Sequence, residues 1–265
     1  MSLIAIYLGL GLASGFVAGL LGVGGGLVLV PALLWLFVAQ GVDAAWPMHL
    51  ALGTSLAVIV FTALSSLRAH HAHGGVRWPI VARMAPGVVL GTLAGALLAP
   101  NLPDGVLRGF FACFLVLVAT QMAFGLAPHS QRPLPGRLSL ASAGAGIGLV
   151  SSWVGIAGGT MTVPFLAWRG VRLPEAIGTS AAVGMPIALA GAAGYALAGL
   201  GKPGLPAHTL GFIHWPAVLA IAPATLLSAP WGARMAHSLP VHLLKRLFAV
   251  VLYLVGLRMA WGVFG

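Results

Sequence analysis

Apolar residues in this chain form long runs separated by short segments rich in proline, glycine and basic residues. The runs cover residues 2–20, 27–39, 49–67, 84–99, 105–126, 138–154, 160–168, 176–200, 215–232 and 246–264. Several runs approach or exceed the roughly 20 residues that a helix needs to cross the hydrocarbon core of a bilayer. The pattern therefore predicts an all-α polytopic membrane protein.

Glycine interrupts the apolar pattern at two places. Four of the five residues in the range 22–26 are glycine, within the sequence GLLGVGGGLVLVP. The second break reads Gly155-Ile156-Ala157-Gly158-Gly159. Because each glycine weakens a helix interior by about 1 kcal/mol, both breaks predict the tip of an apolar helical hairpin instead of one continuous helix.

The two breaks belong to a series of matches between the halves of the chain. The matching pairs are Pro31 and Pro164 after the breaks, 133 residues apart; Gly53-Thr54-Ser55 and Gly178-Thr179-Ser180, 125 apart; and Trp78-Pro79 and Trp215-Pro216, 137 apart. The matches follow the same order along the chain, and their offsets change little. They indicate an internal duplication.

Basic residues fall in different loops of the two halves. The loop at 68–83 holds three arginines, whereas its counterpart at 201–214 holds only Lys202. The distribution reverses later, because 233–246 holds three basic residues and its counterpart near 100–108 holds one arginine and one aspartate. Cytoplasmic loops of membrane proteins are enriched in Lys and Arg. Corresponding loops are therefore expected on opposite sides, which predicts an inverted repeat.

The expected organisation has a first repeat at 1–126, an inter-repeat cytoplasmic loop at 127–137 and a second repeat at 138–265. Each repeat is a glycine-broken hairpin followed by three transmembrane helices. The hairpins are 2–39 and 138–168, and the spans are 49–67, 84–99 and 105–126, then 176–200, 215–232 and 246–264. The pattern allows hairpins that cross the membrane fully or re-enter from one side.

Charge composition bears on the substrate. Hydrophobic residues make up 60% of the chain and charged residues 6%, and 13 Lys and Arg face the three acids Asp43, Asp104 and Glu175. Cation carriers commonly use carboxylates inside the membrane, yet two of these acids are expected in loops and Glu175 at a helix entrance. Cation transport is therefore disfavoured and an anionic substrate is favoured. Arg258 lies inside the last span, and its role is left open.

The glycine breaks are candidate anion sites. Irregular backbone inside a membrane is tolerated where it is buried in protein or lines a watery cavity, and glycine lets a ligand approach the backbone closely. The helices that start after the breaks present free N–H groups with partial positive charge. The candidate residues are Gly24, Gly25 and Gly26 in the first half and Gly158, Gly159 and Thr160 in the second. Close helix packing through small residues is the alternative interpretation.

Hydroxyl groups near the breaks add further candidates. In Gly53-Thr54-Ser55 and Gly178-Thr179-Ser180 the side chains either bond back to helix carbonyls or donate to an oxyanion. Their recurrence in both halves favours a ligand role. His49, just before the first motif, is a candidate for gating by protonation, although a structural role is the more common one for such a histidine.

No cofactor, metal site or nucleic-acid interface is expected. His70, His71 and His73 lie in a basic loop without a nearby acid or cysteine, so a solvated loop is favoured over a metal site. Cys113 is the only cysteine and is expected to be a small buried hydrophobe. The basic loops lack interleaved aromatic residues. The series Gly87, Gly91 and Gly95 predicts close helix packing.

The duplicated glycine breaks with Pro31 and Pro164, the paired Gly-Thr-Ser elements and the hydrophobic pattern of four plus four segments resemble the TauE/SafE sulfite exporter family. The resemblance covers nearly the whole chain. It implies a bacterial inner-membrane carrier of sulfite, thiosulfate or organic sulfonates. In the second half, Ala157 and Thr160 stand where the first half has Gly24 and Leu27, so the expected site is asymmetric.

The leading hypothesis is a secondary transporter of a small sulfur-containing anion, with export favoured. The anion is expected at mid-membrane between the hairpin tips, where backbone N–H groups and the Thr and Ser hydroxyls bind it. The chain is not expected to be an enzyme. Two alternatives remain, namely an intramembrane serine hydrolase with His49 as its base and a membrane subunit without transport activity. The expected partners are the anion and the lipid bilayer, and the oligomeric state is left open.

Overall fold

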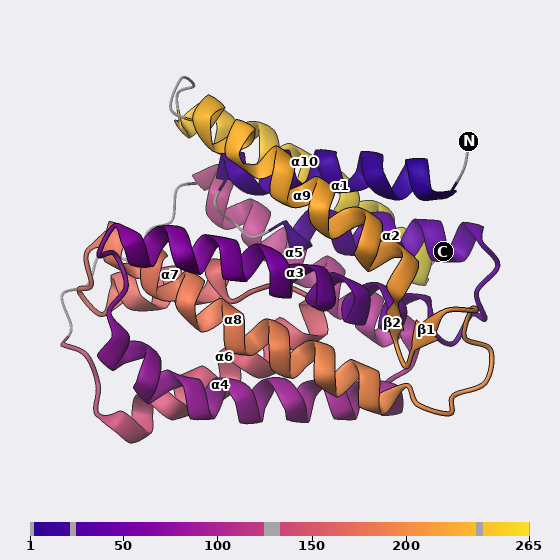
Figure 1. Ribbon diagram of the computed structural model, residues 1–265, viewed down its shortest axis with the longest axis horizontal. Helices are drawn as coiled ribbons and strands as arrows, with labels where there is room; N and C mark the ends of the chain where they lie inside the picture. Colours follow the sequence, from indigo (N-terminus) through magenta and orange to yellow (C-terminus); the bar gives the residue numbers. More distant parts are fainter. Residues whose placement is uncertain (1–2, 22–24, 125–132, 237–240, 265) are drawn as a thin grey trace.

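The chain forms a bundle of helices that run roughly along its longest axis (Figure 1). The structure is a computed structural model that describes residues 3–21, 25–124, 133–236 and 241–264. The elements within these ranges are α1 (Leu3–Leu21), α2 (Gly26–Ala39), α3 (Pro47–Ala72), α4 (Trp78–Leu98), the 3-10 helix η1 (Ala99–Asn101), α5 (Asp104–Phe124), α6 (Arg137–Val154), α7 (Gly159–Trp168), α8 (Leu173–Ala198), β1 (Thr209–Leu210), β2 (Ile213–His214), α9 (Trp215–Ala236) and α10 (Val241–Phe264).

Helix length and surface composition confirm an all-α polytopic membrane protein. Among the described residues, α1, α3, α4, α5 and α8 are long and apolar enough to cross a membrane. Large apolar side chains stand exposed on the outside of the bundle, for example Leu90 at 68%, Leu117 at 63% and Leu219 at 68%. A surface of this kind is stable in lipid and not in water.

Proline and glycine set where the helices begin and end. Proline occupies the first turn of α3, α4 and α8, where its missing N–H costs no hydrogen bond. Gly25 precedes α2 with a φ of 71°, and Gly155 ends α6 with a φ of 65°. Glycine adopts this left-handed conformation without a steric penalty. Both helix breaks therefore fall at the glycine-rich segments.

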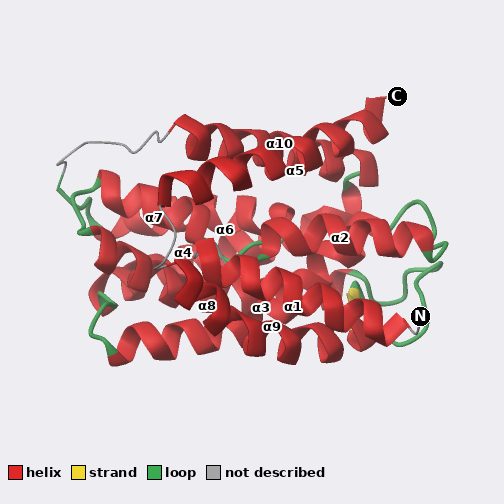
Figure 2. Ribbon diagram, turned by 90° about the horizontal axis from the view of Figure 1, so that it is seen from above, coloured by secondary structure: helices red, strands yellow, loops and turns green. Residues whose placement is uncertain are grey.

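The helices pair across the two halves of the chain. Helix α1 packs along α9 and α4 packs along α6, while α3 pairs with α8 and α5 with α10. Figure 2 shows the α5–α10 pair along one flank of the bundle. If α1 to α5 correspond to α6 to α10 in order, the α1–α9 interface corresponds to the α4–α6 interface. The α3–α8 and α5–α10 pairs then each join two corresponding helices.

The α1–α9 and α4–α6 interfaces also match in detail. A methyl group on Gly11 of α1 would strike Ile221 of α9, and one on Gly144 of α6 would strike Met84 of α4. Gly11 and Gly144 are 133 residues apart, and Met84 and Ile221 are 137 apart. These are the same offsets that relate the two halves of the sequence.

Glycines of α4 confirm the predicted close packing. A side chain on Gly87 or Gly91 would clash with the α6 backbone, at Ala141 and Ala145 respectively. At Gly95 an added Cβ would clash with the Ser152 hydroxyl. Without side chains at these three positions, the two helix backbones lie almost in contact.

The connections between helices are divided between two ends of the bundle. The α3–α4 and α7–α8 connections lie at one end, at the left in Figure 1, and carry Arg77, Arg169 and Arg172. The α2–α3 and α4–α5 connections and the β1–β2 hairpin lie at the other end. In the β hairpin Thr209 pairs with His214 and Leu210 with Ile213.

Two expectations about single residues were wrong. Asp104 is not in a loop, because it is the first residue of α5 and is only 7% exposed. Its carboxylate accepts a hydrogen bond from the Met48 N–H at 2.7 Å and pairs with Arg108 one helical turn later. Cys113 is exposed, not buried, because its side of α5 faces away from the helices that pack against α5.

Candidate functional site

The two glycine breaks meet at the centre of the bundle. A methyl group on Gly26, the first residue of α2, would lie 2.5 Å from the Gly155 carbonyl oxygen, so the two backbones are in contact there. The Ser55 hydroxyl donates to the same Gly155 carbonyl at 2.9 Å. Gly24 lies outside the described residues. The structure thus brings Gly26, Ser55 and the second break together.

The start of α2 is closed by protein. Gly26 is buried and Leu27 is 2% exposed. Gly25 is partly buried, and a Cβ there would approach Ala18 at 3.3 Å. Among the described residues, the first turn of α2 is therefore largely covered by protein, and the Gly155 carbonyl lies against Gly26.

The start of α7 is open by contrast. Gly159 and the neighbouring Ala157 line a cavity of about 460 Å³ between α1, α3, α8 and α9. Ser180, from the second Gly-Thr-Ser motif, lines the same cavity. Of the predicted ligands, Gly159 and Ser180 thus share one cavity, and the asymmetry between the two breaks is visible in the packing.

Polar side chains outside the predicted anion site complete the wall of this cavity. They are Thr62, Ser65, Ser66 and His70 of α3 and Thr225 of α9. The α3 residues recur at three- and four-residue intervals, the spacing that places side chains on one helical face. This spacing could have indicated a polar helical face from the sequence, because a hydroxyl-bearing face is unusual in an apolar helix.

Hydrogen bonding separates the cavity hydroxyls into two kinds. Thr62 donates to the Ile59 carbonyl at 3.2 Å. Thr225 donates to a carbonyl of its own helix at 2.8 Å. Ser65 and Ser66 are exposed to the cavity and its opening. The lining contains no Asp or Glu, so a small anion would meet hydroxyl groups and a helix start without repulsion from a carboxylate.

Three hydroxyl groups around the second break have no protein partner. The oxygens of Ser151, Thr160 and Thr162 are buried without a hydrogen bond in the described structure. Leaving a buried hydroxyl unpaired costs about 1–3 kcal/mol. Thr160, one of the predicted ligands, and Thr162 lie in the first turn of α7 beside Gly159. The region next to the cavity therefore retains unused hydrogen-bonding capacity.

The two Gly-Thr pairs contact backbone in the opposite half of the chain. The His214 N–H donates to Thr54 Oγ1 at 3.0 Å, and the Arg77 N–H donates to Thr179 Oγ1 at 3.0 Å. Thr54 thus accepts a hydrogen bond from the residue just before α9, and Thr179 accepts one from the residue just before α4. Burial, together with the nearby His208, lowers the pKa of His214.

The glycines of these motifs make room for the same contacts. A side chain on Gly53 would strike the Phe212 carbonyl, and one on Gly178 would strike the Gly75 carbonyl. Gly75 and Phe212 are 137 residues apart. Gly53 and Gly178 are therefore positions of close backbone approach, and the acceptor sites of Thr54 and Thr179 are already engaged.

His49 lies away from the cavity. Its side chain is fully buried, with Nε2 at 3.0 Å from the Ala99 carbonyl and Nδ1 at 3.8 Å from Asp104 Oδ1. The rings of Trp46 and Phe212 pack on it at centroid distances of 5.3 and 5.2 Å. His49 does not contact Ser55, whose hydroxyl is bonded to Gly155.

The three clustered histidines are joined to neighbouring groups. His71 Nδ1 accepts a hydrogen bond from the Trp78 indole N–H at 3.3 Å, and His73 Nδ1 lies 2.7 Å from the Ala69 carbonyl. His70 lines the cavity. Among the described residues, no three His, Cys, Asp or Glu side chains are grouped so that they could hold a metal ion.

Comparison with known proteins identifies the family. The family model for the sulfite exporter TauE/SafE matches residues 7–259. A probable membrane transporter protein of Haemophilus influenzae is 38% identical over 94% of this chain and 95% of its own length. The probable membrane transporter protein YunE of Bacillus subtilis is 24% identical over 96% of this chain and 97% of its own length. No solved structure matches the chain significantly. The chain therefore belongs to the sulfite exporter TauE/SafE family and is a multi-pass membrane transporter.

Proposed function

We propose that the protein is a secondary transporter that exports a small sulfur-containing anion, such as sulfite, thiosulfate or an organosulfonate, across a bacterial inner membrane. One observation carries the proposal. The start of α7 and Ser180 face a cavity lined by hydroxyl groups and by no carboxylate. The family membership and the bacterial relatives support the substrate class and the location.

Backbone and hydroxyl donors suit transport of an oxyanion. The N–H groups in the first turn of a helix carry partial positive charge and have no partner within the helix. Gly159 lets the anion reach them closely, and Ser180 and Thr160 add O–H donors. Neutral donors bind an anion without a fixed counter-charge, so they release it more readily than an ion pair would. A volume of 460 Å³ holds about 15 water molecules, enough for a partly hydrated anion.

The two halves are proposed to be inverted repeats that exchange roles during transport. Ser180 now borders the cavity, whereas its counterpart Ser55 is sealed against the Gly155 carbonyl. In the opposite state Ser55 would open and Ser180 would close. The reciprocal contacts of Thr54 and Thr179 support this symmetry. We assign these two threonines a positioning role, and we assign anion binding to Gly158, Gly159, Thr160 and Ser180.

The cavity opens toward one end of the bundle. Ala69 and His70, near the end of α3, line it, and this end also carries the α3–α4 connection (Figure 1). At the other end His49, Thr54 and Phe212 are fully buried. We infer a state in which the anion enters from the arginine-rich side, which the positive-inside rule places in the cytoplasm. His49 then belongs to the closed end, and we propose a gating role for it there.

Substituting Ser180 tests the proposed function. In proteoliposomes, Ser180→Ala should weaken the apparent affinity for sulfite about tenfold or more, because a hydrogen bond to a charged ligand contributes about 1.5–3 kcal/mol. Ser142→Ala is the matched control, since Ser142 is exposed on α6 and donates to the Ser139 carbonyl. Thermal denaturation of both variants separates lost binding from lost folding. Unchanged sulfite flux in Ser180→Ala would exclude Ser180 as a ligand.

A further inference from the structure

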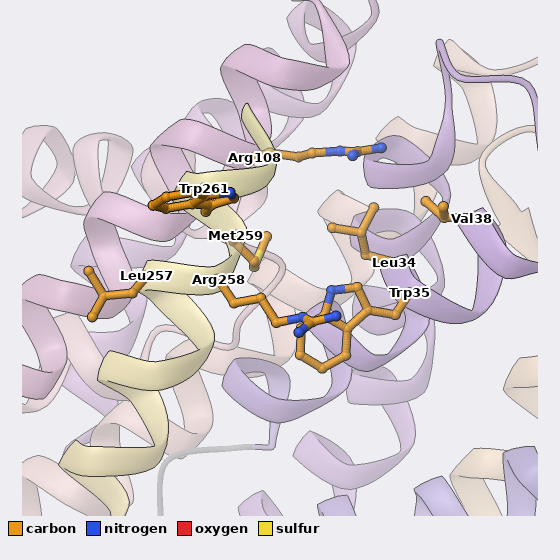
Figure 3. Close-up of a pocket in the computed structure, with 8 residues that line it drawn as sticks. All are labelled: Leu34, Trp35, Val38, Arg108, Leu257, Arg258, Met259 and Trp261. Atoms are coloured by element: carbon orange, nitrogen blue, oxygen red, sulfur yellow. The ribbon is translucent and has the colours of Figure 1, made fainter. Parts of the chain in front are cut away.

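A second cavity lies on the flank of the bundle, between α2, α5 and α10. Its volume is about 630 Å³, and Arg108 of α5 and Arg258 of α10 both line it. Figure 3 shows Arg258 extending from α10 toward Trp35 of α2, with the side chain of Arg108 lying above them in this view. None of its lining residues lines the cavity beside α7. It is therefore a separate site.

The two arginines differ in their charge balance. Arg108 forms an ion pair with Asp104. Arg258 has no carboxylate within ion-pairing distance among the described residues, which include all three acids of the chain. Its guanidinium carbon lies 5.7 Å from the centre of the Trp35 ring. Within the described part of the chain, Arg258 thus brings to the cavity a positive charge that no carboxylate pairs, held against an aromatic face.

These residues lie at one depth in the bundle. Helices α2 and α10 end, and α5 begins, near the same end of the molecule (Figure 1). With a rise of about 1.5 Å per residue, Trp35 and Arg108 each lie about 6 Å from that end of their helix, and Arg258 lies about 9 Å from the last residue of α10. An arginine at this depth extends toward the polar boundary of a bilayer, where lipid phosphates lie.

The remaining walls of the cavity are apolar and open to the surroundings. Val38 is 49% exposed, Leu257 61% and Trp261 79%. In a membrane such side chains contact acyl chains, and tryptophan is enriched at the level of the headgroups. The cavity therefore offers a cation near the level of the lipid phosphates and apolar side chains around it.

We propose that this cavity binds one anionic phospholipid from the leaflet at this end of the bundle. The lipid phosphate pairs with Arg258 and accepts further hydrogen bonds from the N–H groups of Arg108. The acyl chains lie along Leu34 and Leu257, each one residue deeper in its helix than Trp35 and Arg258. A single phosphodiester charge matches the single unbalanced guanidinium, so an anionic lipid is favoured over a second peptide chain or a multiply charged ligand. The lipid then bridges α2 to α10, two helices that few other contacts join.

Lipid titration of the purified full-length protein tests the proposal. Dioleoyl phosphatidylglycerol is compared with dioleoyl phosphatidylcholine, which has the same chains and no net charge, and bound lipid is counted by native mass spectrometry. One phosphatidylglycerol should remain bound, and Arg258→Gln should weaken its binding about fivefold, the effect expected for one arginine near a membrane surface. Arg246→Gln removes an exposed arginine near the start of the same helix and should leave this lipid in place.

Further comparisons separate the lipid from other occupants. Trp35→Leu keeps Arg258 but removes the aromatic face, and it should also weaken the binding of phosphatidylglycerol. This second variant tests the proposal if Arg258→Gln does not fold. Equal retention of phosphatidylcholine would overturn the proposal. So would equal losses in Arg246→Gln and Arg258→Gln, which indicate general charge attraction. A rise in melting temperature with inorganic phosphate alone, as large as that with lipid, would identify a site for a free anion and refute a lipid site.

Discussion

Two threonine hydroxyls, one in each half of the chain, accept hydrogen bonds from the backbone of the other half. Thr54 and Thr179 each accept a hydrogen bond from the residue that precedes a long helix. A backbone N–H buried without a partner costs about 1–3 kcal/mol. The two hydrogen bonds therefore fix where α9 and α4 begin, and with them the depth of those helices in the bundle.

Thr54→Val tests the structural role at this site. Valine has nearly the same shape as threonine but cannot accept the His214 N–H, and His214 is only 5% exposed. We expect the unfolding free energy to fall by about 1–3 kcal/mol. The effect is measured by thermal denaturation in detergent, where the midpoint of Thr54→Val should be lower than that of the wild type.

Thr179→Val provides a graded comparison. Its partner, the Arg77 N–H, is only partly buried, so water can replace the lost acceptor and the destabilisation should be smaller. Ser142→Ala should leave the melting temperature unchanged, because Ser142 is exposed. A Thr54→Val protein as stable as the wild type would show that the hydroxyl acts only through a ligand.

The positions of single residues were predictable where the signal was local. The glycine breaks marked the helix ends, and Gly159 and Ser180 border a cavity. The partner of Thr54 is 160 residues away in the sequence, so no local pattern reveals it. The hydroxyls of Thr62, Ser65 and Ser66 were not predicted as part of the site, because they belong to neither duplicated motif and only their shared helical face connects them.

At the scale of elements, close packing of helices sets the geometry. In soluble proteins the hydrophobic effect drives helices together, but lipid chains are as apolar as leucine, so packing must supply the attraction. Gly91 of α4 and Gly148 of α6 each allow the facing helix backbone to approach closely. A methyl group at such a position has no space to occupy.

Gly91→Ala should destabilise the protein although alanine favours helices. The added methyl group would clash with the Ala145 carbonyl, and overpacking of this kind costs about 1–3 kcal/mol. Gly146→Ala is the matched control, since nothing lies within 4 Å of a methyl group at that exposed position on α6. Gly146→Ala should be neutral or stabilising by up to about 1 kcal/mol.

In thermal denaturation, the melting temperature should fall for Gly91→Ala and stay the same or rise for Gly146→Ala, if the α4–α6 interface is as tight as the structure shows. Two variants with equal melting temperatures would mean that the helices can separate enough to accept a methyl group. Retained transport activity in Gly146→Ala would show that any loss in Gly91→Ala comes from the interface.

Most helices were predictable from hydropathy, whereas their partners were not. Long apolar runs predicted α3, α4, α5 and α8, because span length is dictated by bilayer thickness. The β1–β2 hairpin was not predicted, since each strand has only two residues and pairs with its neighbour inside a connection. Asp104 was placed in a loop because the sequence does not reveal that Arg108 and Met48 compensate its burial.

For the whole molecule, the pairing of helices and the distribution of charge point to the same symmetry. The α1–α9 and α4–α6 interfaces are equivalent in their glycine contacts. The arginines of the α3–α4 and α7–α8 connections lie at one end of the bundle, and Lys202, after α8, lies at the other. If each half crosses the membrane an odd number of times, the second half starts on the opposite side from the first. Two repeats paired in this way would then have opposite orientations.

Labelling of single cysteines from either side of the membrane tests this topology. In a Cys113→Ala background, His73→Cys and Lys202→Cys each place one exposed thiol in a connection at one end of the bundle. A membrane-impermeant maleimide should label Lys202→Cys in right-side-out vesicles and His73→Cys only in inside-out vesicles, because positively charged loops stay in the cytoplasm. The two connections occupy corresponding places in the two halves, after α3 and after α8. Labelling of both thiols from the same side would therefore contradict the inverted repeat and, with it, the proposed exchange of roles between Ser55 and Ser180.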